Sequence, residues 1–315
     1  MQKKISYKKK TITKREQTVS MTIKIQPFRS KLIPFLLFFL ICLALPGSLF
    51  CEEAGIGNEF DKLIQKLVDD GFDREKIEQI FRSKEISFTP ETVSLFFIHS
   101  ESSLDYDQFT SPKAIESALK YLDDNKDILD KAEETFSVDK TVITAILLVE
   151  TRLGSYLGTK TVINTLSTMA ALSDETLREK IWNSIPDEKK PAKEAFIKKA
   201  QDKTNWGYNE LKALLQYAEK EGVAPESIKG SYAGALGVSQ FMPSNALRLA
   251  KDGNNDGKID LFNHADAIFS VANYLKYHGW QSGITRQRQH EILFLYNHSN
   301  YYVDTLLKIS DKLKG

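Results

Sequence analysis

The stretch LLVETRLGSYLG, residues 147–158, places the carboxylate of Glu150 at the end of an apolar run and four residues before Gly154. Ser137-Val138-Asp139-Lys140 supplies a helix start, and the apolar residues after it recur with helical spacing. Glu150 lies four residues after Ile146 and three after Leu147, so it falls on the apolar stripe. We therefore expect a helix that extends to Gly154 and holds this carboxylate toward the core.

A carboxylate in that position has two interpretations. In the structural one, Glu150 pairs with a nearby cation such as Arg152, or it reaches solvent at the helix end. In the functional one, apolar surroundings and the negative end of the helix raise the pKa of Glu150, so that it holds a proton near neutrality. A protonated carboxylic acid beside a cleft can protonate a glycosidic oxygen. The stretch alone leaves both interpretations open.

Charge is distributed unevenly along the 315 residues, of which 42% are hydrophobic and 27% charged. The net charge is +1, but residues 1–51 hold ten Lys/Arg against one acid, Glu16. The remainder carries 33 basic and 41 acidic residues, a net charge of about −8. Because phosphate backbones bind to clustered basic surface, this acidic body argues against a nucleic-acid partner.

The basic N-terminus leads into LIPFLLFFLICLALPGSLFC, residues 32–51. Its uninterrupted apolar core, residues 35–45, is shorter than a bilayer span, which is typical of an export signal. Met21 opens a basic region of more ordinary length than Met1 does, so we expect translation to start at Met21. The sequence therefore predicts an exported protein.

The two cysteines, Cys42 and Cys51, both lie in this leader, so the mature chain holds no internal disulfide. Leu49-Phe50-Cys51 resembles a loose lipobox, although Phe50 is larger than the residue usually found before a lipidated cysteine. Lipidation of Cys51 and cleavage to a soluble form both stay open. An uncleaved anchor helix is disfavoured because prolines bracket a short span.

After residue 52 the apolar residues recur with a period of 3.6, and no clear run of alternating strand residues follows. Helix starts are predicted at Thr89-Pro90-Glu91, Ser111-Pro112 and Ser173-Asp174-Glu175, where a capping residue precedes proline or acid. The charged stretch 185–203 is consistent with a mobile loop or a solvated helix, and we favour the solvated helix. The sequence predicts a mainly α fold.

A second informative stretch is KGSYAGALGVSQFMPSNALRLA, residues 229–250, in which three glycines alternate with small residues. It lacks the Lys-Ser/Thr pair of a phosphate loop. Ser231 and Gln240 offer neutral donors and acceptors suited to hydroxyl and acetamido groups, and Tyr232 and Phe241 are suited to stacking on sugar faces. The alternative is a tightly packed helix turn without a ligand.

The stretch DGNNDGKID, residues 252–260, follows the pattern of a calcium loop, with a glycine at the sixth position and an apolar residue at the eighth. Its twelfth position is Asn263 instead of the usual Glu, and Asp266 is the nearest replacement. The predicted oxygen ligands are Asp252, Asn254, Asp256, the Lys258 carbonyl and Asp266. The alternative is a surface turn rich in Asp and Asn.

Together, and in this order, these three stretches resemble the membrane-bound lytic murein transglycosylase B family. The family's Glu-Thr-Arg-x-Gly sequence is matched by residues 150–154, with Leu153 where Trp is usual. Its glycine-rich block is matched by residues 230–243, and its extended calcium loop by Asp266. Further matches are Val271 to Tyr274, His278-Gly279-Trp280, Tyr296-Asn297 and Tyr301-Tyr302. The resemblance covers about Phe109 to the C-terminus.

The resemblance implies a lysozyme-like helical core over residues 109–315, including a calcium loop at 252–266. A helical part, 52–108, and a leader, 1–51, precede it. Glu150 is implied as the single acid/base, Ser231 and Gln240 as groups lining the sugar subsites, and Tyr274, Tyr296 and Asn297 as the rest of the site. The implied cofactor is a structural Ca²⁺ ion. We expect a periplasmic monomer that acts on peptidoglycan glycan strands and reaches the membrane only through its leader or a lipid on Cys51.

The implied reaction is cleavage of the β-1,4 bond between N-acetylmuramic acid and N-acetylglucosamine, which leaves 1,6-anhydromuramoyl ends. No second carboxylate stands at a fixed spacing from Glu150 to act as nucleophile or base, which fits a single glutamate acting twice. The alternatives are a lysozyme-type hydrolase, a non-catalytic peptidoglycan-binding protein and a calcium-dependent interaction module. The five histidines show no zinc spacing and receive no role.

Overall fold

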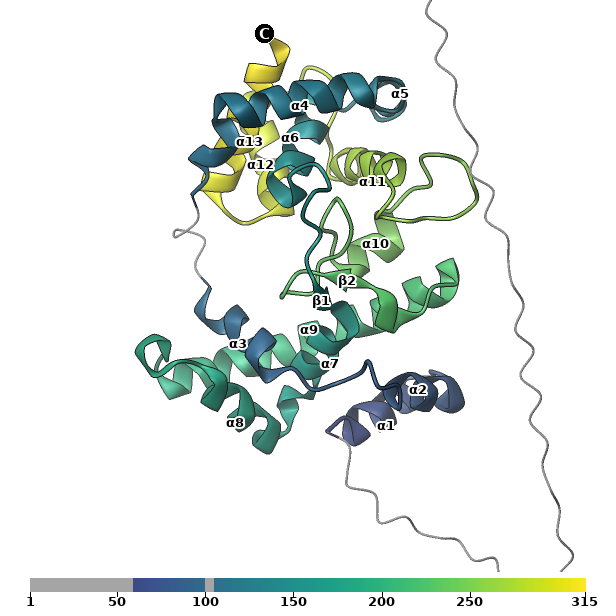
Figure 1. Cartoon of the computed structure of the whole chain (residues 1–315), viewed down its shortest axis with the longest axis vertical. Helices are drawn as coiled ribbons and strands as arrows, with labels where there is room; N and C mark the ends of the chain where they lie inside the picture. Colours follow the sequence, from purple (N-terminus) through teal and green to yellow (C-terminus); the bar gives the residue numbers. More distant parts are fainter. Residues whose placement is uncertain (1–58, 100–104) are drawn as a thin grey trace, which may run out of the picture. The chain divides into compact units, whose positions relative to one another are not determined.

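The computed structural model describes residues 59–99 and 105–315. The predicted export signal, Met21, Cys42 and Cys51 lie outside these residues. The described chain consists mainly of helices joined by loops, with one ribbon of two short strands, which confirms the predicted mainly α fold (Figure 1).

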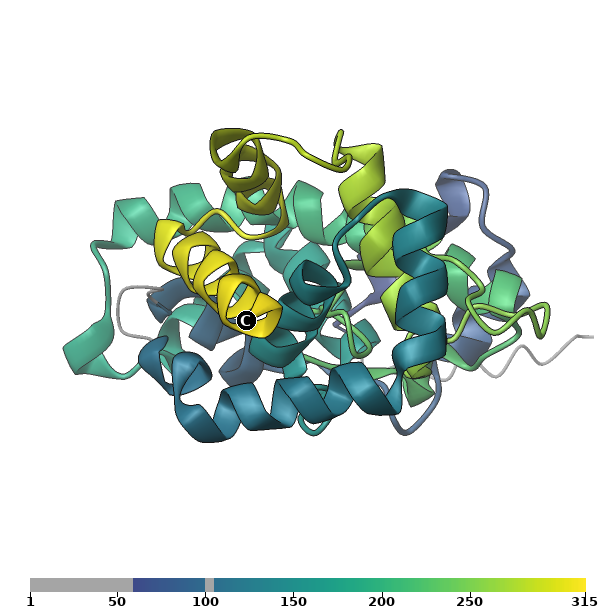
Figure 2. The ribbon, with the colours of Figure 1, turned by 90° about the horizontal axis from the view of Figure 1, so that it is seen from above.

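The helices of the described chain form two groups (Figure 1). Glu150, the candidate catalytic residue, lies on α6, the central helix of the first group. Helix α6 packs against α13, α4, α11 and α5, and Ile143, Ile146 and Leu147 on it are fully buried. Figure 2 looks down on this group, with α12 and α13 beside each other in yellow. The group consists of α4 (Pro112–Asp124), α5 (Lys126–Phe136), α6 (Lys140–Thr151), α11 (His264–Tyr277), α12 (Arg286–Tyr296) and α13 (Asn300–Lys314).

The second group of helices is built around the long helix α9, which packs against α7 (Figure 1). Aromatic and aliphatic residues of α3, α7, α8 and α9 form a separate small core that includes Phe97, Met169 and Phe196. The group consists of α1 (Asp61–Asp69), α2 (Arg74–Phe81), α3 (Pro90–Ile98), α7 (Val162–Ala170), α8 (Glu175–Ser184) and α9 (Lys193–Glu221). Phe60 and Leu67 pack in the same hydrophobic core as Ile143 of α6.

The two groups are joined by the chain around a short antiparallel ribbon, β1 (Lys160–Thr161) paired with β2 (Lys229–Gly230). Glycine is required on both sides of this ribbon. A Cβ on Gly158 would lie 2.1 Å from the carbonyl oxygen of Gly230, and a Cβ on Gly230 would lie 2.0 Å from that of Ala235. The close backbone approach fixes the loop that follows β2, and helix α10 (Pro243–Leu249) comes after it.

The predicted helix starts are confirmed. Ser111 and Asp174 cap α4 and α8 by accepting backbone N–H bonds from the first turn, as their side chains predict. Thr89 precedes α3 without a side-chain cap. Of the charged stretch 185–203, residues 193–203 form the start of α9. Phe196 and Ala200 are buried there and most of the charged residues are exposed, so the solvated-helix interpretation holds for this segment.

None of the helices in the described ranges is both long and apolar enough to cross a membrane.

Candidate active site

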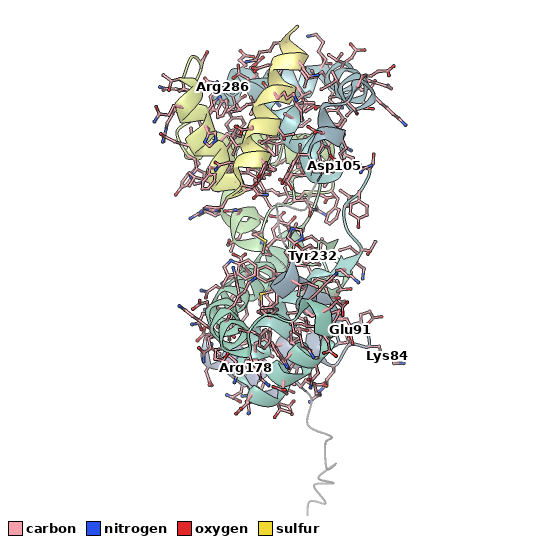
Figure 3. All side chains as sticks on the ribbon, turned by 90° about the vertical axis from the view of Figure 1, so that its left-hand side faces the viewer. Lys84, Glu91, Asp105, Arg178, Tyr232 and Arg286 are labelled. Atoms are coloured by element: carbon pink, nitrogen blue, oxygen red, sulfur yellow. The ribbon has the colours of Figure 1, made fainter. Side chains whose placement is uncertain are left out.

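A cleft of about 530 Å³ opens beside the C-terminal end of α6. Its walls come from α3, from the segment before α4, from α6 and β1, from the loop after β2 and from the start of α13. In Figure 3, Asp105 and Tyr232 mark two of these walls, with Asp105 at the edge of the upper group of helices and Tyr232 at the top of the lower group. Besides its tyrosines, the side chains that supply polar groups are His99, Asp105, Gln108, Glu150, Thr159, Lys160, Ser231, Gln240 and Asn297.

Glu150 lies in this cleft, half-buried at the penultimate residue of α6. The hydroxyl of Tyr302 donates a 2.6 Å hydrogen bond to its Oε1. Burial, and then the charge of Glu150, raise the pKa of Tyr302 well above its ordinary value, so this phenol stays protonated and acts as a donor. Tyr302 therefore holds one carboxylate oxygen in place.

The salt bridge between Glu150 and Arg152, which was the structural alternative for this carboxylate, does not form. Arg152 is exposed and its Nη2 donates a 2.7 Å hydrogen bond to Oε1 of Gln108. Helix α6 ends at Thr151, before the predicted end at Gly154, because Arg152 and Leu153 both adopt left-handed backbone conformations, with φ of 50° and 59°. The carboxylate of Glu150 lines the cleft, where it accepts the hydrogen bond from Tyr302.

The turn after Glu150 is tied to the glycine-rich loop through Thr151, which is fully buried. Its hydroxyl donates to the carbonyl of Val238 at 2.9 Å and accepts the N–H of Gly154 at 3.0 Å. The ring of His264 packs against the same turn so closely that a Cβ added to Gly154 would lie only 2.7 Å from its Cε1 atom. These contacts hold the α6 terminus against the loop.

Two predicted sugar-binding residues, Ser231 and Gln240, line the cleft together with Glu150 and Asn297. The Oγ of Ser231 accepts hydrogen bonds from the N–H groups of Ala233 and Ala235, which leaves its own proton to donate. Gln240 has a left-handed backbone, with φ of 49°, and its Nε2 donates to the Gly237 carbonyl at 2.9 Å. Its amide oxygen is therefore available as an acceptor at the cleft.

Tyr274 and Tyr296, predicted as part of the site, do not line the cleft. The Tyr274 hydroxyl donates to the Leu295 carbonyl at 2.8 Å, and the Tyr296 hydroxyl donates to the Ser239 carbonyl at 2.5 Å. The centroids of their two rings lie 4.9 Å apart. The Tyr296 ring also stacks on that of Tyr302, with the centroids 6.4 Å apart. Burial, and then the charge of Glu150, raise the pKa of Tyr296. Both tyrosines therefore lie outside the cleft lining and support Tyr302 through ring contacts.

Sequence reasoning missed most of the aromatic residues in the cleft. Tyr106, Phe109, Tyr156 and Tyr232 are all part of its lining, and Tyr156 is 66% exposed. Exposed aromatic rings beside neutral polar groups are suited to sugar rings, which present flat C–H faces and hydroxyl edges. Of these four, Tyr232 alone carried a signal, its place in the glycine-rich block.

The predicted calcium ligands are close in sequence, and their carboxylates bond to the loop itself. Asp252 accepts from the N–H groups of Asn255 and Gly257, and Asp256 accepts from that of Lys258. Within residues 59–99 and 105–315, no three His, Cys, Asp or Glu side chains converge as a ready metal site. The oxygen-only donor set is nevertheless the type that Ca²⁺ prefers.

The buried carboxylate of Asp266 gives the strongest support for the calcium prediction. It is 1% exposed, and its two carboxylate oxygens accept from the N–H groups of Gly253 and Asp260, which closes the loop. Burial and, to a lesser extent, the charge of Asp252 raise its pKa. A cation beside these two carboxylates would relieve both effects, so the residues fit the group.

A comparison with known families gives a match over residues 56–293 to the family described as Transglycosylase SLT domain. The chain belongs to this family. The match begins before α1, so the SLT domain includes the helices of residues 59–99 as well as those around Glu150.

Among relatives of this SLT-domain protein, membrane-bound lytic murein transglycosylase B of Escherichia coli (strain K12) is 31% identical over 176 residues, 56% of this chain. The matched region spans 41% of that relative's length.

Solved structures show the same fold. The Escherichia coli lytic transglycosylase SLT35 in complex with calcium superposes with a TM-score of 0.66 at 22% identity, over 81% of this chain and 92% of that chain. SltB3 from Pseudomonas aeruginosa, in complex with NAG-anhNAM-pentapeptide, gives 0.64 at 19% identity, over 82% of this chain and 80% of that chain.

Proposed function

We propose that this SLT-domain protein is a lytic transglycosylase that cleaves the β-1,4 bond between N-acetylmuramic acid and N-acetylglucosamine in peptidoglycan. The observation that carries the proposal is Glu150, a carboxyl group held by Tyr302 in a cleft lined by aromatic rings and neutral polar side chains. Family membership and the named activity of the Escherichia coli relative agree with it.

In the proposed reaction, protonated Glu150 donates its proton to the glycosidic oxygen as that bond breaks. The substrate's own acetamido group stabilises the cation that develops at the anomeric carbon. Glu150 then takes the proton from the muramoyl 6-hydroxyl, which bonds to the same carbon and forms a 1,6-anhydro ring. No water is consumed, and Glu150 ends in its initial protonated state.

The other groups of the cleft hold the sugar in that geometry. Ser231 donates and Gln240 accepts at positions suited to hydroxyl and acetamido groups, and Asn297 extends this polar wall. Tyr274 and Tyr296 position Tyr302 and, through it, Glu150.

A lysozyme-type hydrolase is the second candidate, because the structure brings another carboxylate, Asp105, into the cleft lining. Asp105 is exposed, and its Oδ1 accepts the N–H of Asp107 at 3.1 Å. A hydrolase uses a second carboxylate as nucleophile or as the base for water. An exposed carboxylate at the start of a short helical turn is less suited to that role than a side chain fixed on both sides.

Muralytic assays test the function. The purified protein is mixed with insoluble peptidoglycan and the loss of turbidity is followed for the wild type and for Glu150→Gln. We expect the wild type to dissolve the substrate and the variant to lose all but a trace of this activity. Equal activity of the two proteins would refute the assignment of Glu150, and binding without any cleavage by the wild type would favour the non-catalytic alternative.

Calcium is proposed as a structural ion of the loop between α10 and α11. Asp252, Asn254, Asp256, the Lys258 carbonyl and Asp266 would hold it, and its chemistry would be to neutralise the carboxylates and fix the loop. The calcium complex of SLT35 supports this for a protein of the same fold. The protein is further proposed to work as an exported monomer, held at the membrane through Cys51 if that residue is lipidated.

A further inference from the structure

The turn that follows Glu150 has an unusual backbone. Arg152 and Leu153 are left-handed, with φ of 50° and 59°, and Gly154 comes next with φ of 83°. Residues with a Cβ adopt this conformation at a cost in free energy, which other contacts must offset. A turn of this kind directly after the candidate catalytic residue therefore needs a contact that holds it.

The hydroxyl of Thr151 supplies that contact. Thr151 is 1% exposed, and its Oγ1 accepts the N–H of Gly154 at 3.0 Å, which closes the turn. The same oxygen lies 2.9 Å from the carbonyl oxygen of Val238 and 3.4 Å from that of Leu147. Because a hydroxyl has one proton to donate, the closer carbonyl of Val238 accepts it. One side chain thus fixes the turn and attaches it to the glycine-rich loop.

Val238 belongs to a backbone segment that is held on several sides. Its N–H donates to the carbonyl of Leu261 at 2.8 Å. The carbonyl of the next residue, Ser239, accepts the hydroxyl of Tyr296 at 2.5 Å. The residue after that is Gln240, which lines the cleft. The hydroxyl is therefore bonded to a fixed segment that ends in a candidate sugar-binding residue.

This hydrogen bond connects the two sides of the reaction site. Glu150 directly precedes Thr151, and Gln240 follows Val238 by two residues. Glu150 and Gln240 both line the cleft. The Nε2 of Gln240 also lies 3.4 Å from the carbonyl oxygen of Leu157, farther along the same turn. A carboxyl group that must protonate one atom of a bound sugar loses rate steeply when it is displaced from that sugar.

We propose that Thr151 is a positioning residue of the reaction, whose hydroxyl sets the distance and orientation between Glu150 and a sugar held at Gln240. This inference rests on the proposed function. Thr151 is buried and is not part of the cleft lining. It therefore acts on the rate of the step at Glu150 and not on the affinity for the sugar.

The test changes the hydroxyl of Thr151 and keeps the size of the side chain similar. Thr151→Val replaces the hydroxyl by a methyl group, so the carbonyl of Val238 and the N–H of Gly154 lose this partner. Thr151→Ser keeps the hydroxyl, and Thr151→Cys replaces it by a thiol, a weaker donor and acceptor. Thr144→Val is the matched control, because Thr144 is fully buried on the same helix and its hydroxyl has no hydrogen-bond partner among the described residues.

Initial rates on solubilised glycan strands give kcat and KM for each protein, and circular dichroism confirms that each is folded. We expect Thr151→Val to lower kcat by about 10- to 100-fold and to keep KM within about twofold, because the reacting groups are displaced while sugar binding is retained. Thr151→Ser should restore most of the wild-type kcat, Thr151→Cys should lie between Ser and Val, and Thr144→Val should match the wild type.

Several results would overturn the inference. These are a wild-type kcat in Thr151→Val, an equal loss in Thr144→Val or in Thr151→Ser, and a change confined to KM. If Thr151→Val does not fold, Thr151→Ser and Thr151→Cys decide: a lower kcat in Thr151→Cys supports the inference, and equal kcat values overturn it. An inactive wild type would refute the proposed function itself, whereas an active wild type with an unaffected Thr151→Val would refute this inference alone.

Discussion

The hydroxyl of Tyr302 lies 2.6 Å from Oε1 of Glu150, which joins the start of α13 to the end of α6 across 152 residues of sequence. Tyr302 is 1% exposed, whereas its neighbour Tyr301 is 64% exposed. The same helix turn therefore offers one tyrosine that orients the carboxyl group and one that faces water.

Tyr302→Phe is expected to lower kcat by about ten- to one-hundred-fold, because a hydrogen bond to a charged group is worth about 1.5–3 kcal/mol. KM should change little, since the ring is kept and its hydroxyl bonds to Glu150 and not to the sugar. The pH profile of kcat should shift as well, which a purely structural role would not produce. Tyr301→Phe is the control, and an equal loss in both variants would contradict the role of Tyr302.

Asp105→Asn distinguishes the two candidate reactions. If Glu150 acts alone, the variant should keep at least about half of the wild-type kcat, because Asp105 then contributes only to the cleft wall. A loss comparable to that of Glu150→Gln would assign a second catalytic carboxylate and favour hydrolysis. Initial rates on solubilised glycan strands give the comparison.

Acid should destabilise the fold through His264. Burial lowers the pKa of its imidazole below 6.5. The hydroxyl oxygen of Tyr121 lies 2.8 Å from its Nδ1 atom. Between the folded-state pKa and 6.5 the unfolded chain binds more protons than the folded one, so stability is present above pH 6.5 and is lost as the pH falls through this window.

Urea unfolding at a series of pH values between about 7 and 5 measures this effect. The free energy of unfolding of His264→Gln should fall less over this range than that of the wild type, although its absolute value can be lower. His298→Gln, at an exposed histidine, should follow the wild-type slope. Identical slopes in all three proteins would show that His264 does not titrate as described.

Calcium should raise the thermal stability of the wild type, by about 2.7 kcal/mol when its concentration is one hundred times the dissociation constant. Asp252→Asn should weaken this effect because it removes one of the three carboxylate charges, Asp252, Asp256 and Asp266, in the proposed ligand set. Asp260→Asn, in the same loop but outside the proposed ligand set, should keep it. Thermal unfolding with calcium and with a chelator provides the measurement. No calcium effect on the wild type would leave the loop as a surface turn.

Local patterns were sufficient to predict much of this arrangement. The apolar spacing around Ile146 predicted α6 and put Glu150 on its inner side. The small residues of the glycine-rich block are compatible with the close backbone approach found at Gly230. Each of these features depends on interactions between residues near one another in sequence, or on the absence of a side chain.

The remainder depends on how distant elements dock. Nothing local separates Tyr302 from Tyr301, because which of them meets Glu150 is decided by the rotation of α13 against α6. Tyr274 was expected in the site, yet the packing of α11 places it against Tyr296 and outside the cleft lining. Asp105 enters the cleft from a segment 45 residues before Glu150, which no spacing rule connects to it.

The central claim is that Glu150 drives a reaction in which a sugar hydroxyl, and not water, closes the broken bond. Peptidoglycan is therefore digested in water enriched in heavy oxygen, and the new muramoyl ends are analysed by mass spectrometry. The account predicts ends that lack one water relative to a reducing sugar and carry no heavy oxygen, with none formed by Glu150→Gln. Reducing ends that carry one heavy oxygen would contradict it.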